Sequence, residues 1–151
     1  MMRELRIRPA DTSEQKVLEE LQLRASLTDP GDRDALLAHP DAIEVPLAQI
    51  ASGAVFVAEW KGTIVGFAAL EPRTDGESEL DALFVDPDMR RRGIARSLVE
   101  HCAEVARTQK SGALCVVGNP HAKDFYTAYG FNAIGTAETR FGTALRMRMI
   151  V

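Results

Sequence analysis

The fold of this chain is decided by one stretch, Leu80-Asp81-Ala82-Leu83-Phe84-Val85-Asp86-Pro87-Asp88-Met89-Arg90-Arg91-Arg92-Gly93-Ile94-Ala95. Its mostly apolar beginning predicts a strand, and Asp86-Pro87-Asp88 predicts a turn. From Ile94 onward apolar residues recur every three to four positions, which predicts a helix. This order directs the unpaired N–H groups and the dipole of a helix start at one point among arginines, and such a point binds phosphate.

Gly93 supports phosphate binding at this turn, because a residue without Cβ lets the backbone come close to an anion. The alternative interpretation is a solvated basic loop that precedes an ordinary helix. The hexapeptide from Arg90 to Ala95 leaves both interpretations open when it is considered alone.

Two motifs in this chain resemble those of the GCN5-related N-acetyltransferases. The segment 90–95 reads Arg-x-x-Gly-x-Ala, which is similar to the acyl-CoA pyrophosphate loop of that family. The segment 119–131 resembles the family's Asn…Ala-x-x-Phe-Tyr-x-x-x-Gly-Phe signature. The resemblance is specific from about Glu79 to Phe131 and extends to the order of elements elsewhere. It implies the α/β acyl-CoA N-acyltransferase fold, a mixed sheet of about 6–7 strands flanked by about four helices.

The hydrophobic pattern predicts the element order β-α-α-β-β-β-α-β-α-β-β. Strands are expected at 5–8, 55–60, 63–70, 79–85, 113–118, 131–136 and 144–150. Helices are expected near 17–25, 35–38, 94–108 and 120–129, whereas 42–50 is ambiguous. Asp29-Pro30-Gly31 is expected to break the chain between the first two helices, and a polar loop is expected around Phe141-Gly142. No repeat or linker interrupts the chain, so we expect one N-acetyltransferase domain over 1–151.

Composition indicates a single globular domain rather than a membrane or nucleic-acid-binding protein. The 151 residues are 46% hydrophobic and 26% charged, which suits one core. No apolar run is long enough to span a bilayer, and the N-terminus lacks the apolar segment of a secretory signal peptide. A cytoplasmic location is therefore expected. The net charge of −4 argues against nucleic acid as a partner. Cys102 and Cys115 are interpreted as small core residues rather than as a disulfide or a nucleophile.

Charge is unevenly distributed around the decisive stretch. From Glu71 to Asp88 there are seven acidic residues against Arg73 alone, whereas Met89 to Arg96 holds four arginines and no acid. One interpretation is a basic binding site for a polyanionic cofactor next to an acidic binding site for a cationic acceptor. The other is a solvated loop beside a solvated turn.

The resemblance implies an enzyme that moves an acetyl group from acetyl-CoA to a primary amine, by direct transfer through a tetrahedral intermediate. It implies that the pyrophosphate accepts hydrogen bonds from the N–H groups of Arg92 to Ala95. It also implies that the pantetheine arm pairs, like an additional strand, with the backbone of residues 83–85. The residues expected to bind the cofactor are Leu83, Phe84, Val85, Arg90, Arg91, Arg92, Gly93, Ile94, Ala95 and Asn119. No metal is expected, because His39, His101 and His121 lack the spacing of metal ligands.

Tyr126 is the candidate general acid, since it occupies the tyrosine position of the family's Phe-Tyr element. A phenol with a pKa near 10 can protonate a thiolate whose conjugate acid lies near 8.5, and a modest shift would suffice. The alternative is that Tyr126 only packs its helix. Glu79 is the candidate general base, with Glu77 or Asp81 as alternatives. Asn119 suits either contact with the pantetheine or the capping of the next helix.

The competing function is a non-catalytic acyl-CoA-binding sensor or interaction module. A mononucleotide-binding domain is disfavoured, because neither Gly-x-x-x-x-Gly-Lys nor Gly-x-Gly-x-x-Gly is present. The expected partner is a small-molecule or peptide amine, without nucleic acid or membrane. The identity of that amine, the acyl-chain preference and the formation of a homodimer are left open.

Overall fold

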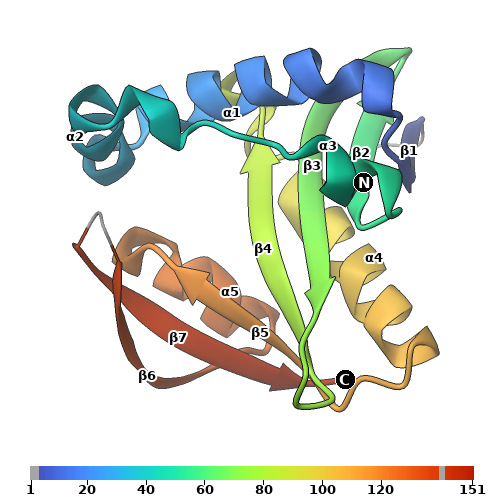
Figure 1. Cartoon of the computed structure of the whole chain (residues 1–151), viewed down its shortest axis with the longest axis vertical. Coiled ribbons are helices and arrows are strands. Elements are labelled where there is room, and N and C mark those ends of the chain that lie inside the picture. The colour runs from blue at the N-terminus through green and yellow to red at the C-terminus, as the bar shows by residue number, and fades with distance from the viewer. Residues whose placement is uncertain (1–3, 140–141) are drawn as a thin grey trace. The chain divides into compact units, whose positions relative to one another are not determined.

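A computed structural model of the chain describes residues 4–139 and 142–151 (Figure 1). Its strands form one mixed sheet of seven, in the order β1-β2-β3-β4-β5-β7-β6. Their bounds are β1 Leu5–Pro9, β2 Val55–Trp60, β3 Thr63–Pro72, β4 Ser78–Val85, β5 Ala113–Gly118, β6 Asn132–Thr139 and β7 Gly142–Ile150. β4 and β5 pair in parallel, whereas β1 with β2, β2 with β3, β5 with β7 and β6 with β7 are antiparallel.

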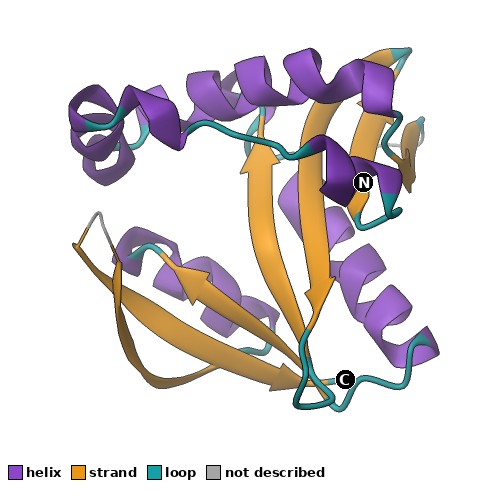
Figure 2. Cartoon of the chain, in the orientation of Figure 1, coloured by secondary structure: helices purple, strands orange, loops and turns teal. Residues whose placement is uncertain are grey.

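Within the described residues, five α-helices connect these strands (Figure 2). They are α1 Gln15–Thr28, α2 Pro30–Ala38, α3 Leu47–Ala51, α4 Ile94–Thr108 and α5 Lys123–Tyr129. Short 3₁₀ turns at Thr12–Glu14, Pro40–Ala42, Pro87–Met89 and Pro120–Ala122 complete the described elements. The predicted α/β fold class is confirmed.

The predicted helix over 94–108 is confirmed in both bounds, and the other elements differ mainly at their ends. The first helix starts after a turn that Asp11 caps by accepting a hydrogen bond from the Ser13 N–H. Pro30 does not simply break the chain, because it opens α2, where the first helical position needs no N–H donor. The ambiguous segment contains the start of α3, and the loop expected around Phe141 falls partly outside the described residues.

The described chain divides into two compact units, 1–69 with 82–101 and 70–81 with 102–151. In the first unit α1 and the strands β2 and β3 enclose a core whose members are almost fully buried. These are Leu18, Leu21, Val45, Ile50, Val55, Val57, Phe67 and Ala69.

Gly66 lets α4 approach the sheet of the first unit very closely. A Cβ at Gly66 would lie 3.0 Å from the Phe84 carbonyl oxygen and 3.1 Å from Cγ2 of Ile94, the first residue of α4. It would also lie 3.2 Å from Cδ1 of Leu98, one turn further along the helix. The start of α4 is therefore seated directly over β3, without space for a side chain in between.

The second unit packs α5 on the antiparallel strands β5 and β7. Val116 of β5 lies opposite Met147 of β7 in the register, and both side chains are buried. A Cβ at Gly118 would come within 3.3 Å of the Tyr126 ring, so α5 lies close to the end of β5. The aromatic rings of Tyr126 and Phe131 meet edge to face at 5.3 Å and complete this core.

Candidate active site

The basic turn between β4 and α4 has an unusual backbone. Asp86 starts it by accepting a hydrogen bond from the Asp88 N–H at 3.0 Å, which forms the 3₁₀ turn Pro87–Met89. Arg91 and Gly93 then take left-handed conformations with φ of 63° and 79°. The Ser97 N–H donates to the Gly93 carbonyl at 3.0 Å and begins the helical pattern. The N–H groups of Gly93, Ile94 and Ala95 precede that bond and lie at the positive end of the helix dipole.

The side chains around this turn carry positive charge. Arg90, Arg91, Arg92 and Arg96 are all exposed, and α4 has no acidic residue in its first turn. Arg90 donates a hydrogen bond to the Thr28 hydroxyl at 2.5 Å, so its guanidinium is anchored to the end of α1. The turn therefore combines helix N–H groups with arginine charge, as the sequence predicts.

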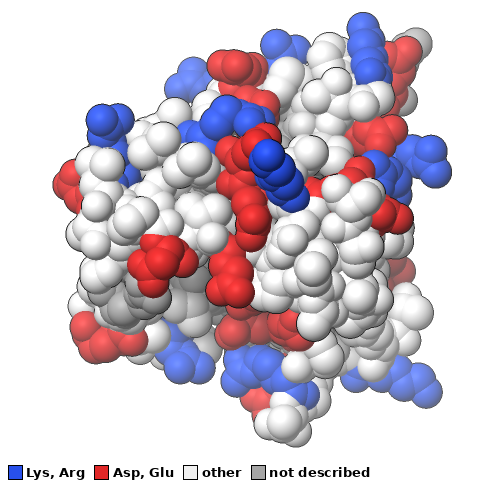
Figure 3. Space-filling view, turned by 45° about the horizontal axis from the view of Figure 1, so that its top comes forward, with Lys and Arg blue, Asp and Glu red and all other residues white. Residues whose placement is uncertain are grey.

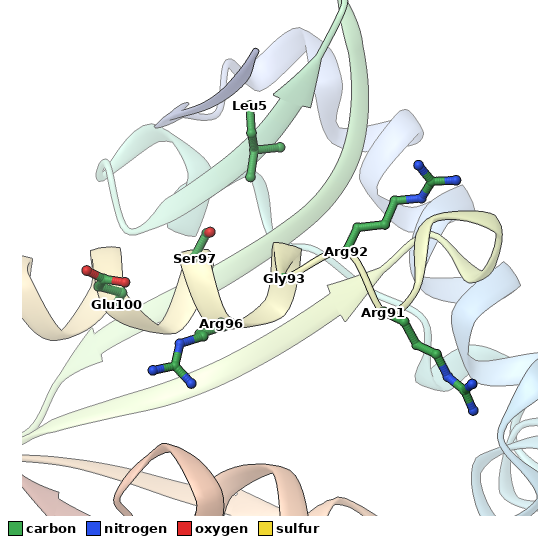
Figure 4. A pocket seen from close by; sticks show the side chains of 7 residues that line it. All are labelled: Leu5, Arg91, Arg92, Gly93, Arg96, Ser97 and Glu100. Carbon is green, nitrogen blue, oxygen red and sulfur yellow. The ribbon is translucent and has the colours of Figure 1, made fainter. Parts of the chain in front are cut away.

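A pocket of about 350 Å³ opens beside this turn. It is lined by Leu5, Arg91, Arg92, Gly93, Arg96, Ser97 and Glu100. Figure 4 shows Arg91 and Arg92 extending from the turn, while Ser97 and Glu100 follow on successive turns of α4. A Cβ at Gly93 would meet nothing within 4 Å, so the space in front of this residue is open to a ligand. These features fit a phosphate-bearing molecule.

The strand that leads into the turn holds the three residues predicted to pair with pantetheine. Leu83, Phe84 and Val85 are half-buried at the end of β4. The Phe84 ring contacts Phe67 with centroids 5.5 Å apart, so this side chain belongs to the core of the first unit. The pairing of their backbone with a ligand stays a prediction.

The second unit contains Asn119 and Tyr126. The Asn119 Oδ1 accepts a hydrogen bond from the His121 N–H at 2.9 Å and so caps the 3₁₀ turn Pro120–Ala122, whereas α5 itself starts at Lys123 without a side-chain cap. Tyr126 is 6% exposed and packs between Phe125 and Phe131. Burial raises the pKa of Tyr126 to about 12. The expectation that a modest shift would help this phenol release its proton is therefore wrong, because the pKa shifts in the opposite direction.

Glu77 is held in place by side chains from two distant strands. Arg148 of β7 donates to both of its carboxylate oxygens at 3.0 Å, and the Cys115 thiol donates to Oε1 at 3.0 Å. The hydrogen bonds from Arg148 and then Cys115 lower the pKa of Glu77 to about 2. A carboxylate so weakly basic and so engaged is a poor general base, which leaves Glu79 and Asp81.

Glu79 lies opposite Cys115 in the parallel register of β4 and β5, and Cys115 lies opposite Arg148 in β7. The three side chains therefore share one face of the sheet of the second unit. The Arg73 guanidinium approaches Glu79 to 3.9 Å and pairs with Asp75 at 2.7 Å. Glu79 is half-buried, whereas Asp81 is exposed.

Arg148 is the residue of this cluster that the sequence interpretation missed. Arg73 is the only basic residue within the sequence from Glu71 to Asp88, but Arg148 from β7 pairs with Glu77 and offsets part of that acidic charge. The alternation Arg146-Met147-Arg148-Met149 was an available signal, since it puts the arginines on the face opposite the methionines. The neighbouring sequence does not indicate which carboxylate Arg148 would bind.

Both cysteines have thiols that resist ionisation. Burial raises the pKa of Cys102 to about 12, and burial together with the hydrogen bond to Glu77 raises the pKa of Cys115 to about 11. Both are free of disulfides. A thiol that stays protonated at neutral pH is a weak nucleophile, which agrees with their interpretation as core residues.

The described residues 4–139 and 142–151 contain no group of three or more His, Cys, Asp and Glu side chains placed to hold a metal ion. Among the same residues, no helix has the length and apolar character that crossing a membrane requires.

Figure 3 shows acidic and basic side chains interspersed on one face of the molecule, so neither sign of charge covers that face.

We expect Glu77→Gln to change the acid sensitivity of the protein. Because the folded state lowers the pKa of Glu77 from 4.5 to about 2, the ionised group stabilises the fold fully above its ordinary pKa. That contribution is lost as the pH falls towards the folded value. The variant should therefore lose less unfolding free energy than the parent between about pH 5 and about pH 2.

Urea unfolding at several pH values measures this difference. Glu104→Gln is the matched control, since Glu104 is an exposed α4 carboxylate paired only to Arg107 among the bonds described, at 2.9 Å. Parallel pH profiles for Glu77→Gln and the parent protein would contradict the prediction.

Comparisons with known proteins agree on one family. The model of the Acetyltransferase (GNAT) family matches residues 18–131. Peptidyl-lysine N-acetyltransferase YjaB of Salmonella typhimurium is 42% identical over 76 residues, and the match covers 49% of this chain and 46% of the relative. The chain thus aligns with about half the length of its curated relatives.

Solved structures share the fold over almost the full chain. The GCN5-related N-acetyltransferase of Rhodopseudomonas palustris has a TM-score of 0.81 at 20% identity, with 100% of this chain and 98% of that chain covered. The PaiA N-acetyltransferase of Thermoplasma acidophilum, solved in complex with coenzyme A, has a TM-score of 0.78 at 15% identity, with 97% and 99% covered. At these identities the likeness shows the fold alone. With the family model matching three quarters of its length, the chain belongs to the Acetyltransferase (GNAT) family.

Proposed function

We propose that residues 1–151 form one N-acetyltransferase domain, which moves an acetyl group from acetyl-CoA to a primary amine. The observation that carries this proposal is the turn before α4, where helix N–H groups, an open Gly93 and exposed arginines surround a pocket. Membership of the acetyltransferase family supports the same conclusion.

The turn binds the pyrophosphate of acetyl-CoA. The N–H groups of Arg92 to Ala95 donate to its oxygens, and the guanidinium groups of Arg91, Arg92 and Arg96 add charge-assisted contacts. The backbone at 83–85 and the amide of Asn119 hold the pantetheine arm. When bound, acetyl-CoA supplies the thioester whose acetyl group is transferred.

The acceptor is a lysine side chain of a peptide. The curated relative is named a peptidyl-lysine N-acetyltransferase, which supports this class for the part of the chain that it matches. A lysine ammonium must lose a proton before it attacks a thioester. Glu79 accepts that proton, directly or through water, and Arg73 nearby keeps its carboxylate oriented.

Tyr126 stabilises the departing thiolate. Its pKa of about 12 keeps the phenol protonated throughout the physiological pH range. Full proton transfer to a thiolate with a conjugate-acid pKa near 8.5 would be unfavourable by roughly 5 kcal/mol. The hydroxyl therefore acts by donating a hydrogen bond to the charge that develops on sulfur.

The acceptor class is tested by thiol release from acetyl-CoA with a panel of amines. We expect turnover with lysine-containing peptides and an acetyl group on lysine Nζ in the mass spectrum of the product. A free amino acid, a polyamine and a peptide with an N-terminal alanine but no lysine are the comparison acceptors. Binding of acetyl-CoA without release of thiol for any amine would favour the sensor module instead.

Gly93→Val should weaken acetyl-CoA binding by at least about tenfold. The new side chain fills the open space before the turn, and a β-branched residue is strained at the φ of 79° found there. Gly62→Val is the matched control, because Gly62 has a φ of 80° and equally open surroundings in the hairpin after β2. Calorimetry that shows equal affinity for both variants would contradict the assignment.

Tyr126→Phe should lower kcat by about 10- to 10³-fold and leave acetyl-CoA affinity nearly unchanged. Because the pKa of Tyr126 is about 12, this residue should add no alkaline decline to the pH profile of kcat below that range. Tyr129→Phe, one turn along the same helix, is the control. An unchanged kcat in Tyr126→Phe, with chemistry as the slow step, would leave Tyr126 with a packing role only.

A further inference from the structure

The face of β5 and β7 that lies opposite α5 contains an arginine that takes no part in the ion pair of Glu77. A Cβ at Gly130, directly after α5, would lie 3.3 Å from the Met149 sulfur, so the methionines of β7 point towards α5. Because side chains alternate along a strand, Arg146 and Arg148 point to the other face. Arg148 pairs there with Glu77, whereas no carboxylate among the described residues pairs with the exposed Arg146. The charge of Arg146 is therefore available to a ligand.

The surroundings of Arg146 leave space for a ligand group. Its neighbour on β6 is Gly135, where an added Cβ would meet nothing within 4 Å. Its neighbour on β5 is Val117, an apolar side chain that is 40% exposed. A guanidinium with one open side can bind a carboxylate through two parallel hydrogen bonds, and Val117 can contact the methylene groups of the same ligand.

Arg146 shares its face with Glu79, the residue that accepts the proton of the acceptor lysine in the proposed function. Glu79 lies opposite Cys115 of β5, and Cys115 lies opposite Arg148 of β7. Arg146 is two positions from Arg148 along the same strand. Since neighbouring strands lie about 4.8 Å apart and a strand rises about 3.3 Å per residue, the Cα atoms of Glu79 and Arg146 are about 12 Å apart. Two side chains of one extended peptide can reach both groups.

Glu79 and Arg146 offer opposite charges to such a peptide. Arg73 pairs with Asp75 at 2.7 Å but lies 3.9 Å from Glu79. The Glu79 carboxylate suits the cationic end of the acceptor lysine, and Arg146 suits an anion in the same molecule. A second cation near Arg146 would be repelled, so this arrangement disfavours peptides with a basic residue there.

We infer that the acceptor is a lysine two positions away from an aspartate or glutamate, whose carboxylate binds Arg146. The inference rests on the proposed function, because it takes Glu79 to act on a lysine of a peptide. It deepens that function by naming a feature of the peptide sequence. Side chains two positions apart in an extended peptide point to the same side, so the lysine and the carboxylate reach this face together.

The test measures thiol release from acetyl-CoA with lysine peptides whose two ends are blocked, so that a side chain carries the only carboxylate. Peptides with Glu two positions before or two positions after the lysine are compared with the same peptides carrying Gln. The parent protein should favour Glu in kcat/KM by about 3- to 10-fold at one of the two positions, mainly through a lower KM. Glu directly next to the lysine should give no such preference, because that side chain points away.

Two substitutions of Arg146 separate recognition from a structural role. Arg146→Gln should reduce the preference to within about 1.5-fold. Arg146→Glu should reverse it in favour of a peptide with Arg at that position, a result that a structural role alone would not produce. Arg107→Gln is the matched control, because it removes the same charge from a helix rather than from this strand, and it should keep the preference of the parent protein. Thermal melting confirms that each variant is folded.

Equal use of the Glu and Gln peptides by the parent protein at both positions, or an unchanged preference in Arg146→Gln, would overturn this inference. In either case acetylation of the lysine would leave the proposed function standing. No acetylation of any of these peptides by the folded parent protein would overturn the inference together with lysine as the proposed acceptor.

Discussion

The position of the basic turn between β4 and α4 depends on the close packing of α4 against β3 at Gly66. A Cβ there would lie 3.0–3.2 Å from the Phe84 carbonyl and from the side chains of Ile94 and Leu98. Since interiors are packed to crystal density, this contact leaves the first turn of α4 little freedom to shift. The N–H groups at the start of α4 are consequently held in place by the core of their own unit.

In the second unit, the register of the strands brings charged side chains together. Neighbouring positions of β4, β5 and β7 hold Glu79, Cys115 and Arg148. Arg148 also forms a hydrogen bond with Glu77. Arg73 serves Asp75 and approaches Glu79. Among the ion pairs described on this face, Arg148 binds Glu77 closely at 3.0 Å, whereas the half-buried Glu79 lies 3.9 Å from Arg73.

The sequence predicts best where one short segment determines its own structure. The helix 94–108 carries an uninterrupted apolar period, and the turn before it contains its own glycine, so both were recognisable. Pro30 was harder, because a proline indicates equally well the end of one helix and the start of another. The partner of Glu77 and the raised pKa of Tyr126 depend on residues such as Arg148 and Phe131 that only folding brings near. Strand register and side-chain burial therefore cannot be predicted from a short stretch of sequence.

The protonated state of the two cysteines has a consequence for the proposed transfer of an acetyl group from a thioester. An ionised thiol within reach of a thioester can take over its acyl group, whereas a protonated thiol reacts poorly. Cys102 and Cys115, with pKa values of about 12 and about 11, hold almost no thiolate at neutral pH. The hydrogen bond from Cys115 to Glu77 reinforces this, because it adds a negative charge next to the sulfur. In the proposed reaction, neither sulfur atom would therefore compete with the amine for the acetyl group.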